Sequence, residues 1–473
     1  MPPPSPGRSV GPSVCVVGGG LAGLSAAITA ADAGAVVTLL ESRARLGGAT
    51  FSFVRDGLSI DNGQHVFLRC CTAYRGFLDR LGVADRVWMQ DRLSLPVVTP
   101  GGRIHHLSRG RGPAPLHLAG SLSRYPLLTA ADKLAAARAV LGLRRIDPED
   151  SRADDMSFGR WLRRTGQSER AIDALWGLLS IPTMNVAPDN ASLGLAAMVF
   201  RTGLLQDSAA GDIGMPAVPL SQLHAEPARA VLDAAGADVR TSARVTAIER
   251  RDDRLLVRTH TGDVPADAVV VAVPHDDVAA ILPEGAVADP TALRGLGASP
   301  IVNLHVIYDR RVTDQRFAVG HASPVQWVFD RSEVAGLSPG DGQYLAVSLS
   351  AAHSYLHLPV AALRERFLPA LAELFPAARA AHLRSFLVTR EPQATFRAAP
   401  GTARLRLGEC TAVPGVLLAG SWTDTGWPAT MEGAVRSGVR AARRALCVER
   451  VSQSREVDAA AADRPSMEGA MST

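Results

Sequence analysis

The sequence predicts an α/β protein in which one domain is assembled from discontinuous segments and a second, α+β domain is inserted between them. Three observations favour this fold. A strand, a glycine turn, a helix and another strand follow one another over residues 13–48, and similar segments return near 221–274 and 416–446. The stretches between them are helical or strand-rich in pattern. A length of 473 residues is enough for two substantial domains.

The first segment carries a glycine fingerprint between an apolar strand and a helix of small residues. Gly18, Gly20 and Gly23 stand in GxGxxG register. In that register the first glycine allows a tight turn, the second lets a pyrophosphate approach the backbone, and the third lets the helix pack on the strand. The amides of Leu21 and Ala22, at the start of the helix, are then available to phosphates.

The second strand ends in Glu41, where a carboxylate can accept hydrogen bonds from ribose hydroxyls. Strand, glycines, helix, strand and acid in this order predict a Rossmann-like dinucleotide-binding domain. Residues 14–31 carry no charge and superficially resemble a signal peptide. Four glycines make them a poor hydrophobic span, so the fingerprint is the better interpretation.

Composition excludes several kinds of chemistry. Lys133 is the single lysine, so the sequence holds no Gly-Lys-Ser/Thr phosphate loop, and a Schiff base would have to use that one residue. Basic residues are spread along the chain and aromatic residues make up only 5%, which speaks against a nucleic-acid partner.

Cysteine usage points to a reducing compartment. An odd, scattered set in a long chain does not form a disulfide framework, and we expect a cytoplasmic protein. No His/Cys cluster has zinc spacing, so we expect no metal site. The five cysteines are Cys15, Cys70, Cys71, Cys410 and Cys447.

The acid of the second strand is followed by SRARLGGAT. This run resembles the flavin amine oxidase and phytoene desaturase superfamily. The resemblance implies an FAD cofactor with Arg43 and Arg45 near it, and with Gly47 and Gly48 letting the backbone approach it. Relatives often have an arginine after the glycine pair, where this chain has Ala49.

Two later segments extend the resemblance over residues 14–447. GADVRTSARVTAIER is similar to the segment whose strand contacts adenine, which implies that Val245 lies there. VLLAGSWTDTGWPATMEGAVRSGVRAA is similar to the C-terminal FAD signature, with Gly420 in its turn. Met431 then begins a helix whose positive end faces the flavin and stabilises its anionic reduced form. Ser421 replaces the acid that relatives offer to the ribityl chain.

Two runs narrow the resemblance to the hydroxysqualene dehydroxylase branch, which serves bacterial hopanoid synthesis. They are GLSIDNGQHVFLRCCTAYRGFLDRLGV and SWTDTGWPATMEGA. The branch reaction is reductive: hydride from reduced FAD reaches an allylic carbon of hydroxysqualene as the hydroxyl leaves, giving squalene. This chemistry needs an acid for the departing hydroxyl and an apolar tunnel for a long isoprenoid.

The resemblance offers two candidate acids, because both stand in motifs expected near the flavin. His65 can donate a proton near neutrality, whereas Asp424 would need burial to raise its pKa. The alternative for His65 is packing or hydrogen bonding to the flavin without proton transfer. The alternative for Asp424 is a turn or a helix cap. Gln64 is expected to be structural or to contact the flavin.

The resulting domain prediction has seven parts. The FAD-binding domain comprises 13–90, 221–290 and 399–447, and the inserted substrate domain comprises a helical region at 91–220 and a mixed sheet at 291–398. Residues 1–12 and 448–473 are predicted to be disordered tails, because their composition provides no packing pattern.

The expected partner is a long apolar isoprenoid, and neither the electron donor nor the oligomeric state follows from the sequence. Residues 113–145 combine apolar residues with Arg124, Arg138, Arg144 and Arg145. They predict either peripheral contact with anionic lipid on the inner membrane face or an ordinary pair of surface helices.

Three other functions remain open. A carotenoid-type desaturase would use the same cofactor motifs with the opposite electron flow. An amine oxidase is less favoured, because its members generally keep a lysine near the flavin and the matching segments here have none. A flavin-free isoprenoid carrier would resemble the Rab escort and GDP-dissociation inhibitor proteins.

Overall fold

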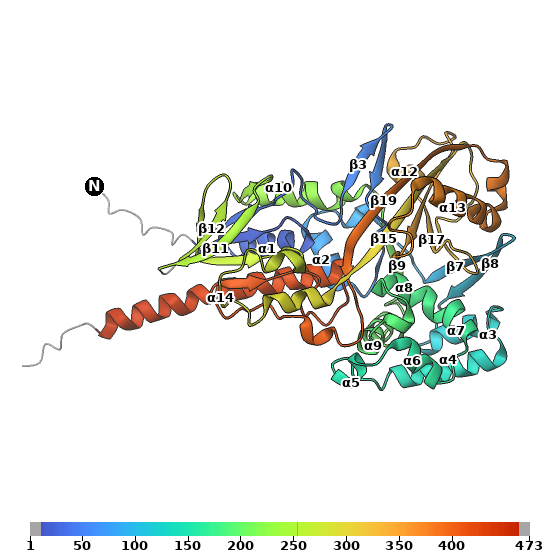
Figure 1. Cartoon of the computed structure of the whole chain (residues 1–473), viewed down its shortest axis with the longest axis horizontal. Helices are drawn as coiled ribbons and strands as arrows, with labels where there is room; N and C mark the ends of the chain where they lie inside the picture. The colour runs from blue at the N-terminus through green and yellow to red at the C-terminus, as the bar shows by residue number, and fades with distance from the viewer. Residues whose placement is uncertain (1–10, 253, 463–473) are drawn as a thin grey trace, which may run out of the picture.

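The structure, a computed structural model, describes residues 11–252 and 254–462. Figure 1 shows a lobe that contains α1, α14, β11 and β12 at one end, and a second lobe with a separate sheet and a group of helices at the other. The predicted α/β class with an inserted α+β domain is confirmed. Most of the predicted N-terminal tail lies outside the described residues.

The first lobe is centred on a five-stranded parallel sheet with the order β10-β2-β1-β14-β20. Its strands come from all three segments that the sequence marked as nucleotide-binding. Apart from the edge strand β10, they are nearly continuous apolar runs because helices cover the sheet. The strands are β1 (Ser13–Val17), β2 (Val36–Leu40), β10 (Asp238–Arg240), β14 (Ala268–Val271) and β20 (Val416–Leu418).

Helices α1 (Leu21–Asp32) and α14 (Met431–Ala462) cross closely in this lobe. A Cβ at Gly438 would lie 2.0 Å from the carbonyl oxygen of Ala22, so the crossing needs a glycine. The sequence predicted that this helix ends near residue 446 and that a disordered tail follows. This prediction was wrong, because α14 continues to Ala462. Residues 439–462 contain no glycine or proline, and glutamate, arginine and alanine favour the helix. Residues 463–473 lie outside the description.

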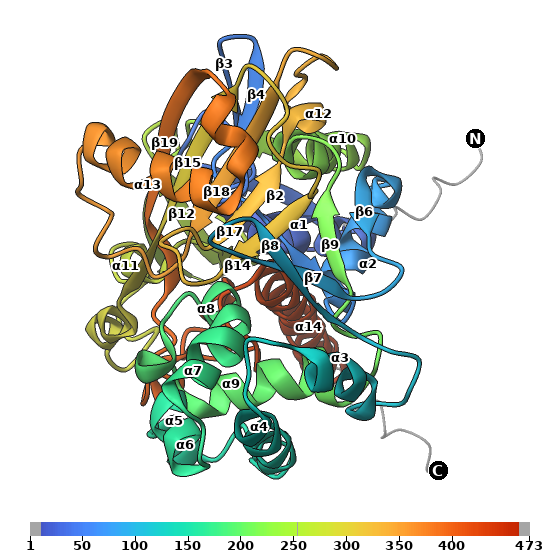
Figure 2. The same cartoon turned by 90° about the vertical axis from the view of Figure 1, so that its right-hand side faces the viewer.

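The second lobe contains a seven-stranded mixed sheet, β19-β15-β18-β17-β16-β7-β8 (Figure 2). Two of its strands lie in the region predicted to be helical, so the boundary at residue 91 was wrong. Pro96 stands inside one of them and hid the strand pattern. The strands are β7 (Ser94–Thr99), β8 (Arg103–Ser108), β15 (Ala298–Tyr308), β16 (Phe317–Gly320), β17 (Trp327–Asp330), β18 (Gln343–Leu349) and β19 (Leu383–Phe396).

Helices make up most of residues 116–205, and they lie below this sheet in the view of Figure 2. No helix in the described residues is both long and apolar enough to cross a membrane. These helices are α3 (Ala119–Arg124), α4 (Ala130–Leu143), α5 (Ser151–Asp154), α6 (Phe158–Arg164), α7 (Glu169–Ala171), α8 (Leu178–Met184) and α9 (Leu193–Phe200); α13 (Val360–Leu374) covers the sheet elsewhere.

Smaller elements join the two lobes. Helices α2 (Thr72–Arg80) and α10 (Glu226–Ala234) flank the first sheet, α11 (His275–Val278) follows β14, and α12 (Ser332–Ala335) lies beside β18. The remaining strands form small antiparallel sheets: β3 (Ser52–Arg55) with β4 (Leu58–Asp61); β5 (Phe67–Leu68) with β9 (Ile213–Pro216) and β6 (Val87–Met89); and β11 (Val245–Arg251) with β12 (Arg254–Thr259) and β13 (Val264–Ala266).

Candidate functional site

The glycine turn has the geometry that a dinucleotide requires. Gly18 has φ +110°, and a Cβ at Gly23 would lie 1.8 Å from the carbonyl oxygen of Gly18, so neither position accepts another residue. Gly20 is the N-cap of α1, where no side chain bonds the helix amides and the first turn holds no acid. The amides of Leu21 and Ala22 therefore remain for an external acceptor.

Glu41 holds this turn in shape. Its Oε2 accepts a hydrogen bond from the Gly19 amide at 2.7 Å, and its Oε1 accepts one from the Arg43 amide at 2.7 Å. A carboxylate has about four acceptor positions, so capacity remains for ribose hydroxyls. The Ala243 amide donates to the Glu41 carbonyl oxygen at 2.8 Å, and this contact brings Val245 beside the same end of the sheet.

The glycine pair at residues 47 and 48 lies against the first turn. Gly47 and Gly48 have φ +99° and +57°, and a Cβ at Gly48 would lie 2.7 Å from Cα of Gly20. Arg45 donates from Nη1 to the Gly48 carbonyl oxygen at 3.0 Å, and its guanidinium lies 3.4 Å from the centre of the Phe51 ring. Arg45 is thus committed to shaping the loop.

Two neighbours in the same run are more exposed. The side chains of Arg43 and Ala49 are exposed to solvent. Position 49 therefore presents no group that could replace the arginine of relatives. Burial lowers the pKa of Arg45, and the positive charge of nearby Arg43 lowers it further.

The C-terminal segment closes the site from the other side. Gly420 has φ +145°, and its amide donates to Ser437 Oγ at 2.8 Å. Ser421 follows it, partly buried, and Met431 is the first residue of α14. The carboxylate of Glu432 accepts from the Tyr74 amide at 2.7 Å at the start of α2, so it does not point into the site.

The Asp-Asn-Gly-Gln-His run is anchored by the second lobe. Asn62 Nδ2 donates to the Ala49 carbonyl oxygen and to Glu391 Oε1, both at 2.9 Å. The Asn62 carbonyl oxygen accepts from Asn303 Nδ2 at 3.0 Å and from Thr389 Oγ1 at 2.9 Å. Strands β15 and β19 therefore position this run against the glycine pair.

The run of residues 61–65 meets the glycine pair and strands β15 and β19 at what we call the junction. The residues at this junction fit a flavin. Gln64 Nε2 and Asn303 Oδ1 are buried, and neither has a hydrogen-bond partner in the described part of the chain. A buried amide without a partner is costly, so such groups point to an occupant that supplies the missing bonds. A flavin ring has acceptors and a donor along its edge. Together with the glycine turn and the free helix amides, this donor set suits a flavin dinucleotide.

His65 is placed beside this junction, but the reason for making it a proton donor does not hold. It lines a small cavity with Gln64 and Phe329. Its side chain is only partly exposed, and burial by the surrounding protein lowers its pKa to about 4. Nearby Asp61 acts in the opposite direction and Arg331 in the same direction. The imidazole is neutral at neutral pH, so it can form hydrogen bonds but is not a ready acid.

Asp424 is not a buried acid either. Its side chain is exposed, and its Oδ1 accepts from the Gly426 amide at 3.3 Å, which is the turn-capping alternative. Arg406 holds the same loop by donating to the carbonyl oxygens of Thr423 at 2.6 Å and Trp427 at 2.7 Å. Burial lowers the pKa of Arg406 to about 10.

Sequence reasoning missed Glu391, Asn303 and Arg406. Glu391 is a partly buried carboxylate at the junction, Asn303 presents an unpartnered oxygen there, and Arg406 holds the neighbouring loop. A signal existed for Asn303 alone of these three, because it is an amide inside the largely apolar strand IVNLHVIY. Glu391 and Arg406 stand in polar stretches where acids and arginines are ordinary.

Comparisons with known proteins agree with this geometry. The profile of the flavin containing amine oxidoreductase family matches residues 21–446. The chain is 31% identical over 449 residues to a hydroxysqualene dehydroxylase of Rhodopseudomonas palustris, covering 93% of this chain and 99% of that protein. It is 25% identical to a 15-cis-phytoene desaturase of Synechococcus elongatus, covering 90% and 94%.

The fold is also shared with solved structures. Cyclohexylamine oxidase from Brevibacterium oxydans superposes with a TM-score of 0.70 at 20% identity, covering 93% of this chain and all of that one. At that identity the likeness shows the fold alone. The family match over most of the chain shows more: this protein belongs to the flavin containing amine oxidoreductase family and is a flavin-dependent oxidoreductase.

Proposed function

We propose that this protein is an FAD-dependent hydroxysqualene dehydroxylase, which reduces hydroxysqualene to squalene in isoprenoid metabolism and serves hopanoid synthesis. The observation that carries the proposal is the 31% identity to the Rhodopseudomonas palustris enzyme over nearly the full length of both chains. The scattered, unpaired cysteines support a cytoplasmic location.

The flavin is proposed to be FAD, held along its whole length by the first lobe. Phosphates would meet the amides of Leu21 and Ala22, the ribose would meet Glu41, and the adenine would meet Val245. The Gly47–Gly48 turn and the start of α14 at Met431 would contact the ring end, with Gln64 Nε2 and Asn303 Oδ1 gaining partners there. Ser421 would offer a hydroxyl to the ribityl chain.

In the proposed reaction the allylic C–O bond breaks, a C–H bond forms at the same carbon, and the hydroxyl leaves as water with one proton. Reduced FAD supplies the hydride. The protein must provide the proton, hold the carbon chain and exclude water. The first lobe binds the cofactor, and the helices α3–α9 with the second sheet provide the apolar body for the substrate.

Glu391 is our candidate for the proton donor in place of His65 and Asp424. It lies on β19 at the junction, where Asn62 Nδ2 donates to its Oε1 and fixes its position beside the Ala49 carbonyl. Asn62 belongs to the same run as Gln64 and also bonds Asn303, and the unpartnered atoms of those two residues are the ones assigned to the proposed flavin ring. Its side chain is more buried than that of Asp424, and the part that stays accessible lets it exchange a proton with solvent between turnovers.

A carotenoid-type desaturase is the second candidate, and the observation favouring it is the 25% identity to the Synechococcus elongatus enzyme. The cofactor residues serve either direction of electron flow. Its substrate would be a hydrocarbon that loses hydrogen instead of an alcohol that loses water.

The test is anaerobic incubation of the photoreduced holoenzyme with hydroxysqualene, followed by product analysis. Squalene in amounts equal to the flavin reoxidised is the expected result. A parallel sample of oxidised enzyme with phytoene is the control. Desaturated phytoene there, with no squalene in the first sample, would replace the proposal with the desaturase.

A further inference from the structure

One face of the second lobe is strongly basic. Residues 103–145, which run through β8, α3 and α4, contain seven arginines and Lys133 but a single acid, Asp132. The carboxylate of Asp132 does not neutralise the exposed positive charge, because it is buried and accepts hydrogen bonds within the protein. Its Oδ2 accepts from the Thr129 amide at 2.9 Å, and its Oδ1 accepts from Ser168 Oγ at 2.6 Å.

Only part of this basic charge is neutralised from elsewhere in the described structure. Arg109 pairs with the buried Asp212. Arg124, Arg138 and Arg145 are exposed and enter none of the ion pairs found among the described residues. The acids that follow α4, at residues 147, 149 and 150, lie beyond its C-terminal end.

The same face exposes apolar side chains. Four of the seven large apolar side chains that are exposed in the described residues lie within residues 103–145: Ile104, Leu116, Leu134 and Leu141, with 42, 67, 55 and 55% of their surface accessible. Leu134 and Leu141 are spaced along α4 with Arg138 between them and Arg145 after them. At helical spacing Leu134, Arg138 and Leu141 share one stripe on α4, and Arg145 follows two residues after the helix ends at Leu143.

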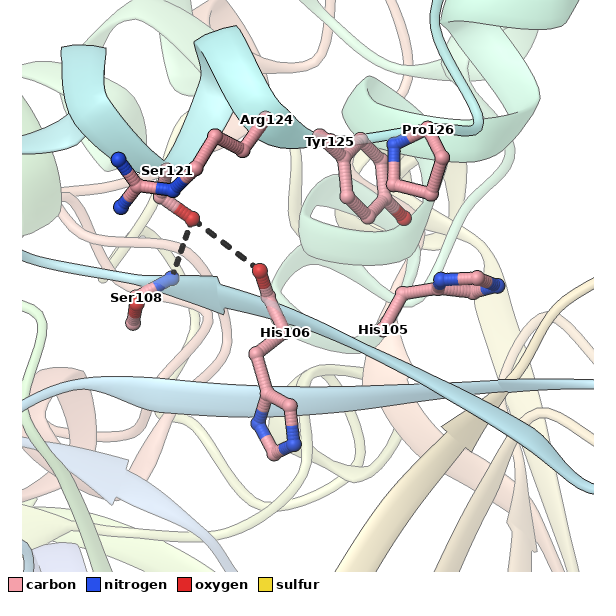
Figure 3. A pocket seen from close by; sticks show the side chains of 7 residues that line it. All are labelled: His105, His106, Ser108, Ser121, Arg124, Tyr125 and Pro126. Carbon is pink, nitrogen blue, oxygen red and sulfur yellow. Dashed lines mark hydrogen bonds between the residues drawn. The ribbon is translucent and has the colours of Figure 1, made fainter.

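A pocket of about 380 Å³ opens between β8 and α3 on this face (Figure 3). Arg124 and Ser121 come from α3, and His105 comes from the strand beneath. Ser121 Oγ accepts from the Ser108 amide at 2.9 Å and donates to the His106 carbonyl oxygen at 3.1 Å, which fixes the two walls relative to each other. The pocket is therefore lined by donors and a cation rather than by acids.

We propose that this face, defined by β8, α3 and α4, docks on the surface of an anionic phospholipid bilayer. The leucines Leu116, Leu134 and Leu141 enter the boundary between headgroups and acyl chains, and the arginines pair with lipid phosphates. The pocket at Arg124 takes one headgroup phosphate. This proposal goes beyond the proposed reaction and does not depend on it, since it requires only basic and apolar groups on one face.

The charge of the face selects this occupant over a second copy of the chain. A second copy would place the same basic stripe opposite itself, and like charges facing each other oppose association. An anionic bilayer offers phosphates that pair with the arginines and an apolar layer that buries the leucines. It is also where an apolar isoprenoid resides, so docking would place the second lobe next to a supply of substrate.

The test is cosedimentation of the flavin-loaded full chain with vesicles of phosphatidylcholine alone or mixed with phosphatidylglycerol. We expect binding to the mixed vesicles that weakens with added salt, and little binding to the neutral ones. The double variant Leu141→Ser/Arg145→Glu should weaken binding about tenfold or more, since it removes an inserted leucine and reverses a charge. Arg124→Gln should weaken it about fivefold.

The matched control is Val54→Ser/Arg55→Glu on β3, a similarly exposed apolar and basic pair far from α4 in Figure 1. Its binding should equal that of the unchanged protein. Equal binding to neutral and anionic vesicles, or loss of binding in the control but not in the α4 variant, would overturn the proposal. The proposal would also be overturned if sedimentation velocity showed a dimer that the α4 variant converts to monomer, because that result assigns the face to a second copy.

Discussion

The two ends of the flavin site are built in different ways. At the proposed dinucleotide end the geometry is set by the backbone: Gly18, Gly20 and Gly23 shape a turn, and no side chain caps the amides at the start of α1. At the ring end, side chains from distant segments meet. Asn62 is held by Glu391, Asn303 and residues around them, all from strands more than two hundred residues away.

This difference explains how each end tolerates change. The backbone end fails through steric clash, because a side chain has nowhere to go. The ring end fails through lost partners, because a buried polar group left alone is costly. The following experiments contrast the two ends, beginning with the largest expected effect.

Gly23→Ala should have the largest effect, because the new Cβ would lie 1.8 Å from the Gly18 carbonyl oxygen. Separating α1 from β1 should cost about 3 kcal/mol or more of the free energy of unfolding. The purified variant should also carry little flavin. Urea unfolding and the ratio of flavin to protein absorbance measure both effects.

Gly76→Ala is the control for that substitution, because Gly76 lies in α2 with no atom within 4 Å of a built Cβ. It should leave flavin content unchanged and stabilise the helix by about 1 kcal/mol at most. If Gly23→Ala retained its flavin and its stability, the backbone account of this end would be wrong.

Asp61→Ala tests the support of the ring end. Asp61 Oδ2 pairs with Arg331 Nη2 at 2.9 Å, and only 5 and 7% of their side chains are exposed. Removing one partner leaves a buried charge alone, which should cost about 3–5 kcal/mol in urea unfolding. The surface pair of Asp32 and Arg80 is the contrast, and Asp32→Ala should cost about 0–1 kcal/mol. Equal losses for the two variants would contradict the account.

Glu391→Gln tests the proposed proton donor. The amide keeps an acceptor for Asn62 but cannot release a proton, so kcat should fall about 100-fold while flavin content is retained. Asp424→Asn should leave kcat nearly unchanged, because that carboxylate is exposed and caps a turn. The reverse pattern would return the role to Asp424.

The last experiment concerns acid stability, where the effect measured per pH unit is the smallest. Burial lowers the pKa of His65 to about 4 and of His224 to about 3, whereas an unfolded histidine titrates near about 6.5. The unfolded chain therefore binds more protons below that pH. Stability should be full above about pH 6.5 and fall by up to about 1.4 kcal/mol per pH unit for each histidine as the pH drops towards 4.

Urea unfolding at several pH values measures this slope. His65→Gln should make it shallower, and His353→Gln, at an exposed position, should not change it. A slope that His65→Gln leaves unaltered would mean that His65 is not held neutral by burial.

The same contrast governs what the sequence could predict. The fingerprint from Gly18 to Glu41 is local, so strand order, turn and helix follow from neighbouring residues, and the structure agrees with them. The fold class was predictable for the same reason. The predicted helical region began too early in the chain, at residue 91, because Pro96 concealed a strand of the second sheet.

The ring end could not be predicted in this way. The role of Glu391 depends on a contact with Asn62 across 329 positions, and no local pattern distinguishes it from a surface acid. His65 stands in a motif that lies near the junction, but its protonation depends on burial that only the folded chain reveals. The exposure of Asp424, which fits its turn-capping alternative, is likewise a property of the fold.

The central claim is that this fold delivers hydride to an allylic alcohol, and the direct measurement is a single turnover of reduced holoenzyme in deuterated water without oxygen. The account predicts that hydroxysqualene reoxidises the flavin and yields squalene carrying one deuterium at the former alcohol carbon. Flavin that stays reduced with hydroxysqualene, or squalene without deuterium, would contradict it.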